Sequence, residues 1–133
     1  MKTGSYLERS DVLRVAAAAE AEAVSNGWAV TIAIVDGGGH LLALNRLDGA
    51  APATAHIAPA KANTAALVRQ ESKSFEDQIN GGRVAFLSAP TLQGVLEGGV
   101  PIIKDGHCLG AVGVSGVLPG QDAQIARAGI AAL

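Results

Sequence analysis

Apolar and polar positions follow two different spacings in the first third of the chain, one typical of a helix and one typical of strands. Between residues 6 and 26 the apolar side chains recur at helical spacing, which predicts a first helix that ends at Asn26-Gly27. Two apolar runs follow, at residues 28–35 and 40–46, and Asp36 with three glycines separates them. Because glycine supplies the positive φ that tight turns require, these runs are predicted to form a β-hairpin.

The middle of the chain is predicted to be helical, with one ambiguity at a proline. An Ala-rich segment extends to about Gln70 and contains Pro59. Proline is favoured in the first turn of a helix, so the helix either starts at residues 58–59 or starts at Thr54 and bends at Pro59. A second, shorter helix is expected at residues 74–79.

The last third of the chain returns to strands and closes with a helix. An Asp-Gly pair between the apolar runs 100–104 and 107–115 is the strongest hairpin signal in the sequence. A short edge strand is expected at residues 91–97, and an amphipathic helix at residues 121–133. Hairpins separated by helices predict an α+β domain with a mostly antiparallel sheet and helices packed on it.

The composition fits one small domain whose core is built from small aliphatic side chains. The chain has 133 residues, of which 49% are hydrophobic but only 3% aromatic, and residues 1–133 are expected to form a single domain. Its net charge of −2 gives no positive field for phosphates, which argues against nucleic acid as a partner. The single cysteine, Cys108, lies in an apolar run and is expected to be a packing residue in a reducing compartment.

Targeting signals are not evident in the sequence. The first residues lack the uninterrupted apolar stretch of a signal peptide, and no apolar run reaches the ~20 residues that a membrane span needs. We therefore expect a cytoplasmic protein without a membrane partner.

A cluster of polar residues follows the second predicted strand. Arg46 and Asp48 lie at its exit, and His56 and Lys61 lie in the helical segment that comes next. Arg46 could grip a carboxylate with two hydrogen bonds, or it could pair with Asp48. Lys61 is expected to face an anion, because the helix dipole disfavours a cation near a helix start. That anion is either Asp48 or Asp36 in a structural ion pair, or the carboxylate of a ligand.

Five short motifs occur in the order in which a known family carries them. They are Val35-Asp36-Gly37-Gly38-Gly39, Arg46-Leu47-Asp48-Gly49-Ala50, a helical segment with Ala58, Lys61, Ala62, Thr64 and Ala65, Gly98-Gly99-Val100-Pro101-Ile102, and the run from Gly110 to Gly116, with Asp122 after them. In these motifs the chain resembles the GlcG/HbpS family of haem-binding and related proteins, which includes the C-terminal domain of PduO-type corrinoid adenosyltransferases. The resemblance covers nearly the whole chain.

The resemblance implies a profilin-like fold, in which helices flank a five-stranded antiparallel sheet. It also implies a homo-oligomer (a dimer, tetramer or octamer) and haem as a candidate ligand, although the family includes members placed beside catabolic enzymes and members without a settled role. The loop at residues 116–121 departs from the family, because relatives carry a more polar loop ahead of Asp122. The ligand of this chain could therefore differ from theirs.

The three histidines and Ser115 complete the set of candidate residues. The histidines show no His-x-x-x-His or comparable spacing, so no dedicated metal site is expected. His56 could act as an acid–base group or as an axial ligand of haem iron, and the simpler alternative is an exposed histidine near a helix start. His40 and His107 follow glycine turns and are expected to face solvent. Ser115 is a further candidate for ligand contact, although it lacks the G-x-S-x-G context of a nucleophile.

Two functional hypotheses follow from these residues. In the first, the chain is a binding protein that holds haem or another carboxylate-bearing small molecule near Arg46, Asp48, His56, Lys61 and Ser115. In the second, it is a metal-independent enzyme that acts on a small organic acid by proton transfer, isomerisation, addition or hydrolysis. Arg46 would then orient the carboxylate, and Lys61, His56 or Asp48 would move the proton. The sequence leaves both hypotheses open.

Overall fold

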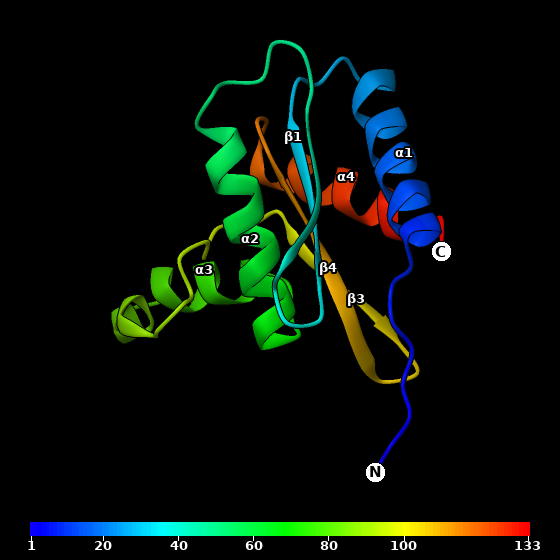
Figure 1. The fold of residues 1–133 in the computed structure, drawn as a ribbon. Helices are drawn as coiled ribbons and strands as arrows, with labels where there is room; N and C mark the ends of the chain where they lie inside the picture. The colour runs from blue at the N-terminus through cyan, green and yellow to red at the C-terminus, as the bar shows by residue number, and fades with distance from the viewer.

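A four-stranded antiparallel sheet lies between two layers of helices in the computed structural model, which describes all 133 residues (Figure 1). The helices are α1 (Arg9–Ser25), α2 (Thr54–Val68), α3 (Lys73–Asn80), the short 3₁₀ helix η1 (Val84–Ser88) and α4 (Pro119–Ile130). The strands are β1 (Thr31–Asp36), β2 (Leu41–Arg46), β3 (Gly99–Lys104) and β4 (His107–Ser115), and their order across the sheet is β2-β1-β4-β3. This architecture confirms the predicted α+β class.

The predicted fifth strand at residues 91–97 does not form, so the sheet has four strands rather than five. This segment lies against α2 instead, where a side chain at Gly94 would collide with the backbone of Ala60. The outer edge of β3 is taken by Ser72, whose backbone N–H donates to the Gly99 carbonyl oxygen at 3.0 Å. Residues 91–97 therefore pack on a helix and do not extend the sheet.

Both predicted hairpins are confirmed. β1 pairs with β2 and β3 pairs with β4, and β1 and β4 join the two hairpins at the centre of the sheet. In the β3–β4 turn, Asp105 has a φ of 52° and Gly106 a φ of 78°. Positive φ at both central residues is what a two-residue hairpin turn of this kind requires, and Asp-Gly meets that requirement at low cost.

The start of α2 is anchored to the sheet by a side-chain contact. α2 starts at Thr54 and contains Pro59, so the alternative start at residues 58–59 is wrong. The Thr54 hydroxyl oxygen lies 2.8 Å from that of Thr31, which fixes the first turn of α2 to β1. None of the helices combines the length and apolar character that crossing a membrane requires.

Different side chains fill the two sides of the sheet. Toward α1 and α4 the core contains large residues such as Ile32, Ile34 and Ile125. Toward α2 it consists of alanines and one valine, which are Ala33, Val35, Ala58, Ala62, Ala65, Ala66 and Ala111. Any side chain at Gly113 of β4 would collide with the backbone of α2. α2 therefore lies very close to the sheet, and this proximity brings Lys61 within reach of the end of β4.

Candidate functional site

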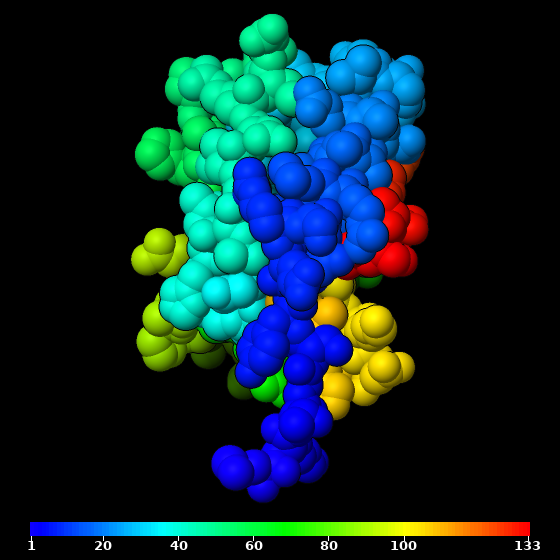
Figure 2. All heavy atoms as spheres, turned by 45° about the vertical axis from the view of Figure 1, so that its right-hand side comes forward, coloured from blue at the N-terminus to red at the C-terminus, as the bar shows by residue number.

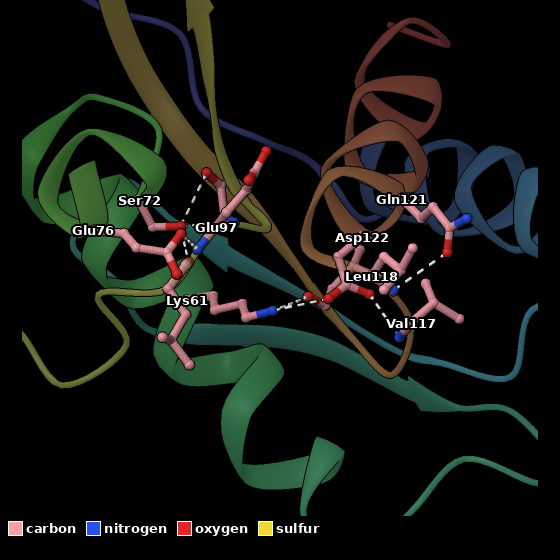
Figure 3. A network of polar contacts seen from close by, with 11 residues as sticks. Lys61, Ser72, Glu76, Glu97, Val117, Leu118, Gln121 and Asp122 are labelled. Atoms are coloured by element: carbon pink, nitrogen blue, oxygen red, sulfur yellow. Dashed lines mark hydrogen bonds and ion pairs between the residues drawn. The ribbon is translucent and has the colours of Figure 1, made fainter. Parts of the chain in front are cut away.

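Lys61 forms a buried ion pair with a residue from the far end of the chain (Figure 3). Its Nζ lies 3.0 Å from Oδ2 of Asp122 and donates to the carbonyl oxygen of Val114 at 2.9 Å. The two side chains are only 4% and 3% exposed. An anionic partner for Lys61 was expected, but the choice of Asp48 or Asp36 is wrong, because α4 brings Asp122 to the ammonium group.

Asp122 is held on both of its carboxylate oxygens. While Oδ2 contacts Lys61, Oδ1 accepts a hydrogen bond from the backbone N–H of Val117 at 3.1 Å. Burial raises the pKa of Asp122 above its ordinary value of 3.8, and the lowering effects of Lys61 and Val117 offset this only in part. Gly98 closes over the pair: a Cβ at this position would lie 2.8 Å from Nζ of Lys61. The pair thus joins α2 on one face of the sheet to α4 on the other.

A second polar network lies beside this pair and fixes the start of β3 (Figure 3). The hydroxyl of Ser72 accepts a hydrogen bond from the N–H of Gly99 at 2.9 Å and donates to the Leu96 carbonyl oxygen. The N–H of Glu97 donates to the carboxylate of Glu76 on α3 at 3.1 Å. These bonds hold residues 96–99, which cover Lys61, in place. The groups that form them are therefore already bonded within the chain.

Arg46 lies at the end of β2 and binds a backbone carbonyl instead of a carboxylate. Its Nε and Nη2 donate to the carbonyl oxygen of Ala50 at 3.1 and 2.9 Å. The alternative ion pair with Asp48 does not form. Because Nη1 makes no hydrogen bond within the chain, the guanidinium is held in place with donors to spare. It could therefore receive a carboxylate.

The sheet register places Arg46 and Ser115 in one row, on the side that faces α2. Thr31 lies opposite Arg46 in β2 and opposite Ser115 in β4. Thr31 also contacts Thr54, so the first turn of α2, which carries the exposed His56, lies at this same end of the sheet. Ser115 is only 6% exposed. Arg46, His56 and Ser115 are thus brought to one end, whereas the ammonium group of Lys61 turns toward β4 and α4.

A hollow of about 270 Å³ lies between β2 and α2. Its walls combine apolar and neutral polar residues, which are Val35, Gly39, Leu41, Pro59, Ala60, Asn63, Thr91 and Gln93. Ala60 and Asn63 follow His56 by four and seven residues, so these three share one face of α2. His56 and Arg46 do not line the hollow; they lie toward the other end of α2 and β2 from it. The sequence pattern does not indicate this hollow, because its walls come from three segments that are distant in sequence.

The remaining candidates also lie outside this hollow. Asp48 borders a different hollow of about 340 Å³ beside Trp28 and Leu47. Cys108 is half-buried, and its thiol donates to the Gly110 carbonyl oxygen at 3.3 Å. His107 is exposed at the β3–β4 turn, and no three His, Cys, Asp or Glu side chains are grouped so that they could hold a metal ion.

Comparisons with known proteins agree with this architecture. A family model described as "Haem degrading protein HbpS-like" matches residues 7–131. The chain belongs to the HbpS-like family. This confirms the resemblance that the sequence motifs suggested.

The relatives of this HbpS-like chain include both sequences and solved structures. Protein GlcG of Escherichia coli (strain K12) is 51% identical over 115 residues, which are 86% of this chain and 85% of GlcG. The crystal structure of HbpS shares 30% identity and superposes with a TM-score of 0.90 over 100% of this chain and 94% of that one. The crystal structure of a PduOC:haem complex shares 29% identity and has a TM-score of 0.88 over 97% of this chain and 96% of that one.

Proposed function

We propose that this HbpS-like chain binds haem, or another small molecule that carries carboxylates, over the hollow between β2 and α2, with Arg46 and His56 as its polar contacts. The observation that carries the proposal is the likeness to PduOC, whose structure is that of a haem complex, at 29% identity over nearly the whole chain. The description of the matching family, which names haem degradation, points to the same ligand. Arg46 and His56 suit such a ligand chemically.

Arg46 is the group that would hold a carboxylate. A guanidinium binds carboxylates with parallel N–H···O bonds, and Arg46 keeps Nη1 free for this purpose. Its bonds to Ala50 fix the orientation of the side chain before a ligand arrives, which reduces the entropy lost on binding.

His56 is the group that would reach the iron. A neutral imidazole nitrogen is a common axial ligand of haem, and His56 is exposed on the first turn of α2. One helical turn further along the same face, Pro59 and Ala60 form part of the hollow, together with Val35 and Leu41. These walls would cover part of a flat apolar ring.

We assign supporting roles to the other predicted site residues. Ser115 lies in the row of Arg46 but is buried, and the Lys61–Asp122 pair holds the adjacent Val114. Asp48 would lie at the outer rim. We favour binding over the acid–base enzyme, because the ammonium of Lys61 is bonded to Asp122 and Val114 and would have to leave both to move a proton.

Titration with haemin, followed through the Soret band, tests the proposal. We expect the native chain to shift the band, His56→Ala to change its position and weaken binding, and Arg46→Met to weaken binding at least tenfold. His107→Ala is the matched control, since His107 is an exposed histidine at the distant β3–β4 turn. The proposal fails if the native chain does not shift the band, or if His56→Ala and His107→Ala behave alike.

A further inference from the structure

Asn63 of α2 has a buried amide oxygen that no donor of the chain satisfies. Its Oδ1 is enclosed and forms no hydrogen bond, while its Nδ2 forms one long hydrogen bond, at 3.4 Å, to the carbonyl oxygen of Gly39. Buried polar atoms nearly always have a partner, because burial costs them their hydrogen bonds to water. Since Asn63 is also a wall of the hollow between β2 and α2, its oxygen is a position at which the donor group of a ligand would be stabilised.

The β1–β2 turn leaves space for this amide. Gly39 has a φ of 82°, and a Cβ at this position would lie 2.9 Å from Nδ2 of Asn63. A side chain at residue 39 would therefore displace the amide from its place. Gly39 lines the hollow together with Asn63, so the turn and the helix jointly present the amide at its wall.

The walls of the hollow carry no formal charge. Its volume of about 270 Å³ lies just below the range of about 300 to 1,000 Å³ that is typical of pockets for drug-sized ligands. An ionised group inside it would have no counter-charge on the walls, which makes burial of such a group unfavourable. The hollow therefore suits a small, uncharged molecule. Its polar walls are Asn63, Thr91 and Gln93, and its apolar side chains are Val35, Leu41, Pro59 and Ala60.

Thr91 gives a second observation at the same wall. It has a φ of 65°, a backbone conformation that β-branched residues rarely adopt. Residues held in such conformations are common at ligand-binding sites, where the surrounding structure keeps them in place. The hydroxyl of Thr91 donates to the carbonyl oxygen of Pro90 at 2.6 Å, which leaves its own oxygen able to accept a hydrogen bond.

The N-terminal segment of the chain does not fill this hollow. Ser5, Tyr6 and Leu7 line a different hollow, of about 450 Å³, together with His40 and Leu42. Leu7 packs against the core that faces α1 and α4. Figure 2 shows the dark blue N-terminal segment passing the cyan surface of the β1–β2 hairpin. An occupant of the hollow beside Asn63 would therefore be a separate molecule.

We infer that this hollow binds a small, uncharged molecule through a carboxamide or hydroxyl group that donates a hydrogen bond to Oδ1 of Asn63. Nδ2 uses only one of its two N–H groups, so a ligand group that both donates and accepts can form two hydrogen bonds with the amide. A carboxylate accepts only and would face Oδ1 without a proton between them. Arg46 and His56 are not walls of the hollow, so the inference does not rest on haem binding.

Three probes of nearly equal size separate these chemistries. Acetamide donates and accepts, acetone only accepts, and acetate accepts and is charged. In NMR titrations of the ¹⁵N-labelled full chain without haem, acetamide should shift the side-chain N–H signals of Asn63 in a saturable way. Acetone and acetate should bind at least tenfold more weakly, because a site built for a hydrogen-bond donor rejects analogues that lack one. Equal shifts for the three probes, or none with acetamide, overturn the inference whatever haemin does.

Two asparagine variants locate the site. Asn63→Leu removes the amide at similar size and should abolish the acetamide shift of the backbone N–H signals of Gly39 and Thr91. Asn45→Leu is the matched control, since Asn45 is exposed and lies opposite Ile32, whose side chain belongs to the core that faces α1. This variant should keep the native response. A retained response in Asn63→Leu overturns the inference, and if that variant does not fold, the three probes on the native chain decide alone.

Discussion

Asp36 is the residue on which the β1–β2 turn depends. Its Oδ1 accepts hydrogen bonds from the backbone N–H groups of Gly38 and His40 at 2.9 and 3.0 Å, and it lies 3.1 Å from Nδ1 of His40. Partial burial acts to raise the pKa of Asp36, but the contacts with His40 and Gly38 outweigh it, and the pKa lies below its ordinary 3.8. The carboxylate is therefore more stable in the folded chain than in the unfolded one.

The sign of the resulting pH dependence follows from linkage. Because the pKa of Asp36 is lower in the folded chain than in the unfolded one, its carboxylate stabilises the fold above pH 3.8. This contribution is lost as the pH falls through the pKa of Asp36 in the folded chain. Observation of the Asp36 carboxyl carbon by NMR during an acid titration should give a midpoint below 3.8. His40→Ala, which keeps the backbone N–H but removes the ring, should raise that midpoint. A midpoint at or above 3.8 in the native chain contradicts this account.

At the scale of the elements, one glycine decides how β3 begins. Gly98 has a φ of 131°, and a Cβ there would lie 2.7 Å from the Val114 carbonyl oxygen and 3.1 Å from Cβ of Asp122. Gly98→Ala should therefore lower the free energy of unfolding by at least about 2 kcal/mol, because strain and collision add. The measurement is chemical denaturation followed by circular dichroism.

The control for this substitution is a glycine that also has a positive φ but lies in open surroundings. Gly106 has a φ of 78°, and a Cβ added to it would meet no other atom within 4 Å. Gly106→Ala therefore carries the backbone cost alone, about 1 kcal/mol. If the free energy of unfolding falls by the same amount in both alanine variants, the close packing of Gly98 over the Lys61–Asp122 pair contributes nothing to stability.

Elements held by local chemistry could be predicted from the sequence, and elements held by distant contacts could not. The Asp105-Gly106 pair alone predicts the β3–β4 hairpin, because these residue types adopt the positive φ that a two-residue turn requires. Residues 91–97 show only a weak pattern, from which a short edge strand is predicted, but their structure depends on how Gly94 fits against α2. The packing of Gly94 on α2 is a contact between distant segments, and the pattern of apolar residues does not predict it.

The candidate site shows the same division. Arg46 and His56 could be placed at one end of the sheet, because a strand exit and the helix that follows it are close in sequence. The partner of Lys61 could not be named, since Asp122 lies 61 residues away and only the packing of α4 brings it near. The sequence indicates Asp122 only by its place after the family motifs and near the start of the last predicted helix, and neither names Lys61 as its partner.

At the scale of the whole molecule, the Lys61–Asp122 pair links the two helical layers around the end of β4. α2 carries the lysine on one face of the sheet, and α4 carries the aspartate from the other. Removing one partner leaves a buried charge without a counter-charge, which costs about 3 to 5 kcal/mol, whereas replacing both with apolar residues of similar size is often neutral.

A double-mutant cycle separates these two effects. Lys61→Met and Asp122→Leu should each lower the free energy of unfolding by about 3 kcal/mol, and the double variant should lie within about 1 kcal/mol of the native chain. Urea denaturation at pH 7 measures all four proteins. Such a result would mean that the pair confers specificity of helix placement more than net stability, because its removal as a unit is tolerated. Additive losses in the double variant would instead show that each residue stabilises the fold through packing of its own, and that the two charges act independently.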